Sequence, residues 1–253
     1  MNVFGLDVGG SGIKGAPVDT STGELVSERV RIKTPQPSTP EAIVKTCVEV
    51  VEKSGWDGGP VGCGFPAVIK DGVVRTAANI DDAAIGFDLG GRLSQELGYD
   101  VRVVNDGDAA GLAEIRWGAG RGVDGVVLML TLGTGIGTSL FVEGRLVPNT
   151  ELGHIEIGGQ DAETRAADSA RKRDDLSWEQ YAQRLDEYVK TIENLFWPDL
   201  IVVGGGISKK SEKFLPHLTA RTRVVPAQML NEAGIAGAAL AAVPRDSAVT
   251  AAE

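Results

Sequence analysis

The sequence predicts an α/β protein made of two duplicated lobes. Segments with strand and helix patterns of hydrophobic residues alternate along the chain. Glycine is abundant, with 34 residues in 253, and it is concentrated in a few short segments. Two of these, Gly10-Ser11-Gly12-Ile13 and Gly133-Thr134-Gly135-Ile136, are similar and start 123 positions apart, close to half the chain length. Each lies between two strand-like segments, which indicates an internal duplication.

The first half contains clear strand, turn and helix signals. Thr39 is a suitable N-cap and Pro40 fits the first helical position, so a helix is expected to start there and to close at Gly55. Asp88 begins a second helix, which ends at Gly98. The expected strands are residues 2–8, 13–18, 24–32, 61–65 and 101–104.

The second half opens with a strand over residues 126–132, a glycine turn and a further strand through Val142. Ser177 and Gln180 have the spacing of a capping box, so a long helix is predicted from Ser177 to the stop at Pro198. A buried strand over 200–203 then leads into three glycines, and a helix follows from Asn231 to about Leu240. We expect a small lobe over 1–108, completed by the C-terminal helix 232–243, and a large lobe over 109–231.

Composition excludes several classes of protein. The net charge of −10 argues against general binding to nucleic acid or to acidic membranes. No apolar stretch approaches the length of a membrane span, and the N-terminus lacks the pattern of a leader, so a cytoplasmic protein is expected. Cys47 and Cys63 lie in apolar patterns and are expected in the core, with no disulfide framework.

The first glycine turn has a weak match to a dinucleotide fingerprint, Gly10-x-Gly12-x-x-Gly15. That fingerprint requires a following helix N-terminus, whereas the residues from Ala16 continue as a strand, so a dehydrogenase is disfavoured. Successive backbone N–H groups in such a turn can bind an anion. Lys14 would add a positive charge, and Asp7 could hold a hydrated Mg²⁺. The alternative is an ordinary hairpin turn.

Two further sites combine polar side chains. Asp106, at the end of a strand, could accept a proton from a substrate hydroxyl. Taken alone, the local pattern favours the alternative, an N-cap for a helix over 108–117. Glu151 and His154 lie three residues apart and could bind adjacent sugar hydroxyls. His217 has no such neighbours and is expected at the surface.

Seven motifs occur in a characteristic order, and together they resemble the ROK family of sugar kinases. The insertion of Gly12-Ile13 before Lys14 resembles the polyphosphate glucokinase branch in particular. The similarity extends over about residues 2–240. The motifs are Asp7–Gly15, Gly64-Phe65-Pro66, Asn79, Asn105–Ala110, Leu132–Gly137, Glu151-Leu152-Gly153-His154 and Val203–Ile207.

The resemblance implies an actin-like ATPase fold, which is ribonuclease H-like, with two duplicated lobes and a cleft between them. It implies a hexokinase-type phosphotransferase that acts on the 6-hydroxyl of glucose, with Asp106 as the catalytic base and Mg²⁺ bound by Asp7 through water. The residues matching sugar-binding positions are Asn79, Asn105, Glu151, His154 and Glu163. The residues matching donor-binding positions are Gly10, Ser11, Gly12, Lys14, Gly133, Thr134, Gly135, Gly204, Gly205 and Gly206.

The sequence departs from the family pattern in two places. Many relatives carry a zinc-binding cysteine cluster after the Glu-Leu-Gly-His motif, but this chain has no cysteine beyond Cys63, so no zinc site of that type is expected. Relatives often have a tryptophan after the position of Asn79, where this chain has Ala83-Ala84.

We expect inorganic polyphosphate as a phosphoryl donor, with ATP alongside it. A long polyanion needs cations beyond the glycine turns, although each candidate could be an ordinary solvated charge. The alternatives are an ATP-only glucokinase or mannokinase, or a non-catalytic sugar sensor. Donor preference, other hexoses and the oligomeric state, including a homodimer, stay open. The candidate cations are Lys209, Lys210, Lys213, Arg116, Arg121 and Arg145.

Overall fold

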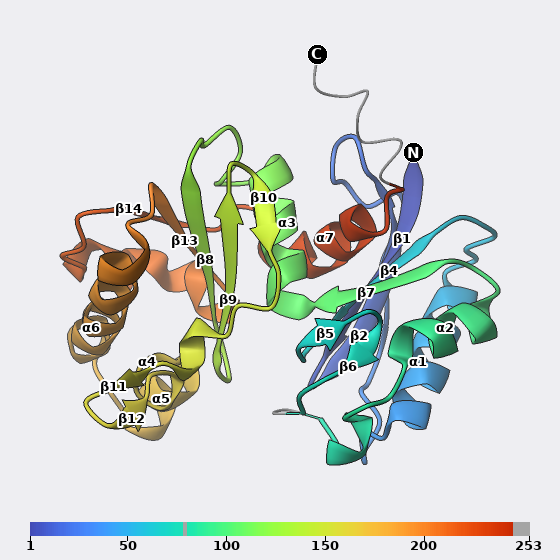
Figure 1. Cartoon of the computed structure of the whole chain (residues 1–253), viewed down its shortest axis with the longest axis horizontal. Helices are drawn as coiled ribbons and strands as arrows, with labels where there is room; N and C mark the ends of the chain where they lie inside the picture. Colours follow the sequence, from blue (N-terminus) through green and yellow to red (C-terminus); the bar gives the residue numbers. More distant parts are fainter. Residues whose placement is uncertain (78–79, 245–253) are drawn as a thin grey trace. The chain divides into compact units, whose positions relative to one another are not determined.

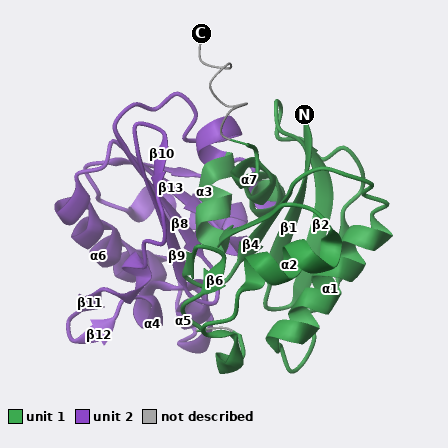
Figure 2. Ribbon diagram, turned by 45° about the vertical axis from the view of Figure 1, so that its right-hand side comes forward, with its two compact units in different colours: residues 1–113, 232–253 green, residues 114–231 purple. Residues whose placement is uncertain are grey.

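A computed structural model describes residues 1–77 and 80–244. The chain divides into two compact units, each described here by itself. Unit 1 contains residues 1–113 and the segment from Glu232 onward, and unit 2 contains Glu114–Asn231 (Figure 2). No helix among the described residues is long and apolar enough to cross a membrane.

Unit 1 is built on a five-stranded sheet with the order β3-β2-β1-β4-β7. The first three strands in the sequence form an antiparallel meander, and β4 and β7 extend the sheet in parallel to β1. The strands are β1 (Asn2–Gly9), β2 (Gly12–Asp19), β3 (Val30–Ile32), β4 (Val61–Phe65) and β7 (Val101–Asn105).

Unit 2 repeats this arrangement in a second sheet with the order β10-β9-β8-β13-β14. Again an antiparallel meander is followed by two parallel strands, so the internal duplication predicted from the glycine segments is confirmed. The strands are β8 (Val126–Leu132), β9 (Ile136–Val142), β10 (Arg145–Val147), β13 (Leu200–Gly204) and β14 (Arg223–Pro226).

One strand prediction is wrong in extent. The strand expected over 24–32 is reduced to β3, and only an isolated bridge from Leu25 to Val18 precedes it. The intervening Val26 side chain is 52% exposed, because this segment lies at the sheet edge without a second partner strand among the described residues. Little side-chain burial is therefore available to stabilise a longer strand in this segment.

Helices cover both faces of the unit 1 sheet. Phe4 and Leu6 point into a core shared with α1 (Pro40–Lys53) and α2 (Leu89–Leu97). On the opposite face α7 (Ala233–Ala241) lies directly on β1 and β4 (Figure 1). Gly5 and Gly62 permit this close approach, since a methyl group at either position would overlap the α7 backbone.

The core of unit 2 lies between its sheet and α6 (Trp178–Phe196), where Tyr181, Leu185 and Val189 are fully buried. The predicted capping box is confirmed, with Ser177 Oγ accepting from Gln180 N and Gln180 Oε1 from Ser177 N. The remaining helices are α3 (Asp106–Trp117), α4 (Glu163–Ala166), α5 (Asp168–Arg173), η1 (Asp82–Ala84), η2 (Leu152–His154), η3 (Gly206–Lys213), η4 (Leu215–His217) and η5 (Leu230–Glu232). The short hairpins are β5 (Ile69–Lys70) with β6 (Val73–Val74), and β11 (Glu156–Ile157) with β12 (Gln160–Asp161).

Candidate active site

The first glycine turn joins β1 to β2, and Gly9 pairs with Gly12 across it. Asp7 lies opposite Lys14 in the same strand pair, and the Lys14 Nζ–Asp7 Oδ2 distance is 3.1 Å. The sequence predicts that Lys14 binds phosphate and that Asp7 holds hydrated Mg²⁺, and it indicates no contact between the two residues. In the structure the two groups form a half-buried ion pair, which holds the Lys14 ammonium group beside the turn.

Asp106 follows β7 and opens α3 at the same edge of the unit 1 sheet as Asp7. The parallel register pairs Asp7 with Gly64 of β4, and Gly64 with Val104 of β7. Asp106 Oδ1 accepts a hydrogen bond from the Gly107 amide at 2.8 Å. Its side chain is partly exposed, so the carboxylate can be approached from solvent.

Asn105 takes the capping position that was considered for Asp106. Its Oδ1 accepts from the Asp108 amide at 3.0 Å, and its Nδ2 donates to the Ala67 carbonyl at 3.2 Å. Asn105 therefore ties the start of α3 to the segment after β4. This places Asp106 one residue into the helix with a fixed backbone.

In unit 2 the two remaining glycine segments lie side by side. Gly204 pairs with Thr131 in the parallel strands β13 and β8, and Gly205 contacts the Leu132 backbone. The turn from Gly133 is fixed by α5, where the Ser169 amide donates to Gly133 O at 3.0 Å and Ser169 Oγ to Thr134 O at 2.5 Å. The segments 133–135 and 204–206 thus follow the paired strands β8 and β13 at the same end of the sheet.

Glu151, His154 and Glu163 also gather in unit 2, together with Asp161. His154 Nδ1 lies 2.9 Å from Asp161 Oδ2, and His154 Nε2 lies 3.9 Å from Glu151 Oε2. The hydrogen bond with Asp161 raises the pKa of His154, and burial raises the pKa of Glu151. Ligand atoms of His154, Asp161 and Glu163 lie within 4.8 Å of one another, a set that suits either sugar hydroxyls or a cation.

Glu163 links this cluster to the second glycine turn. Its Oε2 accepts from the Ile136 amide at 3.0 Å and lies against Gly135, where a methyl group would overlap it. The groups proposed for the sugar and for the donor phosphates are therefore adjacent within unit 2.

A sequence profile of the ROK family matches residues 3–166. The chain belongs to the ROK family. The polyphosphate glucokinase of Mycobacterium tuberculosis (strain CDC 1551 / Oshkosh) is 51% identical over 241 residues, covering 95% of this chain and 91% of that protein.

Solved structures agree with this membership. The inorganic polyphosphate/ATP-glucomannokinase from Arthrobacter sp. strain KM has a TM-score of 0.90 at 51% identity, covering 94% of this chain and 97% of that chain. The ROK family glucokinase from Streptomyces griseus, solved with glucose and AMPPNP, has a TM-score of 0.81 at 26% identity, covering 96% and 99%. The predicted actin-like ATPase fold is confirmed.

The structure of this ROK protein brings the sequence-predicted residues into two groups. Unit 1 gathers Asp7, Gly10, Ser11, Gly12, Lys14, Asn105 and Asp106 at one sheet edge. Unit 2 gathers Glu151, His154 and Glu163 beside the glycine segments 133–135 and 204–206. Asn79 lies outside the described residues.

Two residues of the candidate site were not predicted from the sequence. Arg31 Nη2 donates to Ser11 O at 3.3 Å, and its guanidinium group lies beside Gly12, so the first turn has a second cation. Strand pairing of Arg31 with Lys14 puts it there, and pairing is not visible in local patterns. Asp161 had a local signal, since Gly158-Gly159, both with positive φ, form the two-residue turn of a hairpin that carries Asp161 back towards His154.

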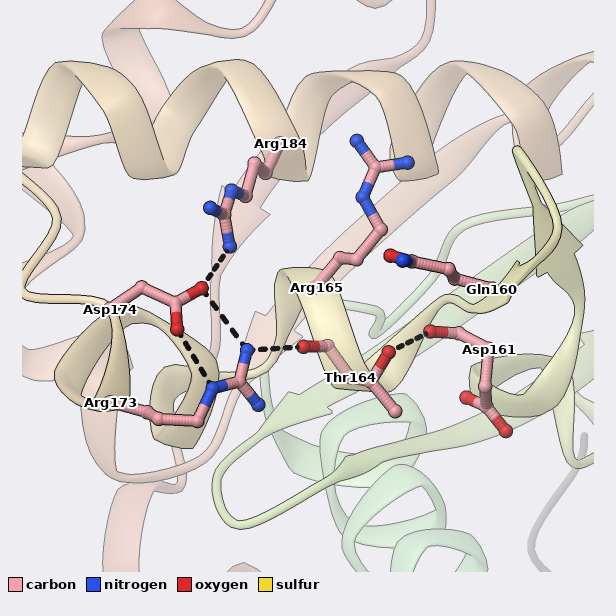
Figure 3. A pocket seen from close by; sticks show the side chains of 7 residues that line it. All are labelled: Gln160, Asp161, Thr164, Arg165, Arg173, Asp174 and Arg184. Atoms are coloured by element: carbon pink, nitrogen blue, oxygen red, sulfur yellow. Dashed lines mark hydrogen bonds and ion pairs between the residues drawn. The ribbon is translucent and has the colours of Figure 1, made fainter.

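A polar pocket of about 630 Å³ adjoins Asp161 (Figure 3). Asp174 accepts from Arg173 Nε at 2.8 Å and from Arg184 Nη1 at 2.6 Å, and these bonds hold the pKa of Asp174 well below its usual range. Arg165 is paired with Glu187 at 2.8 Å. Since each arginine already has a carboxylate partner, ion pairs brace this pocket. The lining residues are Gln160, Asp161, Thr164, Arg165, Arg173, Asp174 and Arg184.

Proposed function

We propose that this protein transfers a phosphoryl group to the 6-hydroxyl of glucose, with inorganic polyphosphate and ATP as donors. The observation that carries the proposal is the 51% identity over 95% of the chain to a protein named polyphosphate glucokinase. The position of Asp106 supports it, because this carboxylate lies at the sheet edge that also carries the first glycine turn. The net charge of −10 favours small-molecule substrates over nucleic acid, and we expect the protein to act in the cytoplasm.

Asp106 acts as the general base. Its carboxylate accepts the proton of the sugar 6-hydroxyl while that oxygen forms a bond to the terminal phosphorus of the donor. The bond from this phosphorus to the bridging oxygen breaks, and the electron pair leaves with ADP or with a polyphosphate one unit shorter. Such reactions depend mainly on positioning and on neutralising charge.

The other residues bind and orient. Asn79, Asn105, Glu151, His154 and Glu163 would bind sugar hydroxyls, and the glycine segments would donate backbone N–H groups to phosphate oxygens. Asp7 offers a carboxylate at a strand end, a hard oxygen ligand of the kind that Mg²⁺ prefers, and would hold the ion through water. Bound there, Mg²⁺ would neutralise charge on the donor oxygens.

The test is to measure initial rates with glucose while supplying ATP and polyphosphate separately and together. Both donors should support turnover. Asp106→Asn should lower kcat by about 10²-fold or more with a small change in glucose affinity. Asp100→Asn is the matched control, because it makes the same chemical change on an exposed residue at the other end of β7. Near-normal kcat in Asp106→Asn would show that this residue is not the base. Turnover with ATP but none with polyphosphate at low salt would refute the polyphosphate part of the proposal.

Mannose is a second acceptor to test in the same assay. The solved relative at a TM-score of 0.90 is named a glucomannokinase, so a pocket of this kind can accept both hexoses. A non-catalytic sugar sensor is the alternative class, and the retained Asp106 carboxylate at the strand end argues against it.

A further inference from the structure

Three cations surround a single tryptophan in unit 2. Arg171 of α5 lies 4.4 Å from the centre of the Trp178 ring, measured from its guanidinium carbon. The ammonium groups of Lys210 and Lys213, both from η3, lie 5.9 and 5.7 Å from the same centre. We call these four residues the Trp178 cluster.

The indole packs against a buried aromatic ring. Phe214, which is fully buried, stacks on Trp178 with ring centres 6.0 Å apart and planes within 15°. Trp178 itself is partly exposed at the start of α6. The cations therefore contact an aromatic surface at the boundary with solvent.

Both helices that bring these cations contact a glycine segment at their first turn. Ser169 of α5 bonds to the Gly133 and Thr134 backbone, and Ser208 of η3 donates to Gly205 O at 2.8 Å. Lys210 and Lys213 are the fifth and eighth residues of η3, and the backbone kinks at Lys210, where φ and ψ are not helical. The three cations of the Trp178 cluster thus follow the first turn of the two helices that contact the donor-binding segments.

The local charge is opposite in sign to that of the chain. The α5 helix and η3 each contain three basic residues and one carboxylate. Together they have a net charge of +4, in a chain whose net charge is −10. Arg171 and Lys172 both contact Asp168. Among residues 1–77 and 80–244, Lys209, Lys210 and Lys213 have no carboxylate within ion-pair distance. Like charges repel, so the clustering of these basic side chains is more favourable when an anion is bound between them.

We propose that the Trp178 cluster is a second binding site for the polyphosphate chain, occupied by phosphates beyond those at the glycine segments. The inference rests on the proposed polyphosphate-dependent activity and names the surface that would distinguish a long donor from a short one. ATP and tripolyphosphate have three phosphates each, so the phosphates bound at the glycine segments would leave none for the Trp178 cluster. Only a longer chain would have phosphates left to contact Lys210 and Lys213, which have no carboxylate partner among the described residues.

The test compares the KM for long-chain polyphosphate, tripolyphosphate and ATP in Lys210→Ala/Lys213→Ala. Loss of two phosphate contacts should raise the KM for the long chain about tenfold and lower its dependence on salt, with little effect on the other two donors. Lys210→Arg/Lys213→Arg, which keeps the charge, should restore the long-chain KM. Lys45→Ala/Lys53→Ala is the matched control, since it removes the same charge from the exposed side of α1 in unit 1.

An unchanged long-chain KM in Lys210→Ala/Lys213→Ala would overturn the inference. So would an equal rise for tripolyphosphate, or an equal rise in the α1 control, because either would indicate a general charge effect. If the unmodified protein uses ATP but no polyphosphate of any length, the proposed donor fails as well. If it uses long chains normally in every variant, only the second site fails.

Discussion

His154 owes its raised pKa first to one neighbour, the Asp161 carboxylate 2.9 Å from its Nδ1. A protonated ring donates to a charged acceptor in this geometry, which favours the imidazolium form. The folded pKa lies above the ordinary value, so this pair stabilises the fold at acidic pH, and its contribution is lost as pH rises through the folded pKa.

Asp161→Asn should therefore lower the pKa of His154, because an amide oxygen accepts the hydrogen bond without a negative charge. The pKa is measured from the imidazole C–H signals in an NMR titration. The chain has two histidines, so His217→Gln in both backgrounds leaves one signal to follow. The same substitution should reduce stability more at acidic than at alkaline pH. An unchanged titration would assign the raised pKa to the other carboxylates, Glu151 and Glu163.

Individual elements were predictable where their signals are local. Thr39 accepts from the Ala42 amide as the N-cap of α1, and Gly98 ends α2 in the left-handed conformation with φ of 71°. Capping and turn chemistry involve residues a few positions apart, so the sequence displays them directly. The eight residues of η3 have no such marker and were missed.

The candidate site was predictable in its residue types but not in its partners. Family motifs indicated Asp7 and Lys14 separately, yet their ion pair depends on the register between β1 and β2. Arg31 reaches the first turn through a further register, that of β2 with β3. Register is a property of paired strands, so a local pattern cannot specify it.

The contact between α7 and β4 gives a test at the level of elements. Gly62→Ala should destabilise the protein by about 1–3 kcal/mol, because the new methyl group would overlap the Ala238 carbonyl and α7 would have to move. The measurement is the midpoint of urea unfolding. Gly58→Ala is the control, since a methyl group there meets no atom within 4 Å. Equal midpoints for the two variants would show that α7 can shift to accommodate the methyl group without loss of stability.

At the level of the whole molecule, we predict that the purified protein contains no stoichiometric zinc and that chelators leave its unfolding midpoint unchanged. Both cysteines are fully buried in the core of unit 1, where a hydrogen bond to Cys47 and burial raise the pKa of the Cys63 thiol. Because both thiols are buried among apolar side chains, neither is accessible to a metal ion from solvent. The measurement is elemental analysis with and without EDTA. One zinc per chain, lost in Asp161→Asn, would contradict this and assign the metal to His154, Asp161 and Glu163.

The chain path also orders events during synthesis. Unit 2 is one continuous segment, Glu114–Asn231, whereas the sheet of unit 1 receives α7 only from residues 233–241. While the ribosome is still adding those residues, the face around Gly5 and Gly62 has no helix on it. The sheet that contains the first strands is therefore covered on this face only when nearly the last residues of the described chain have been made. A chain that ended before Ala233 would contain every element of unit 2 but would lack the helix that covers one face of the unit 1 sheet.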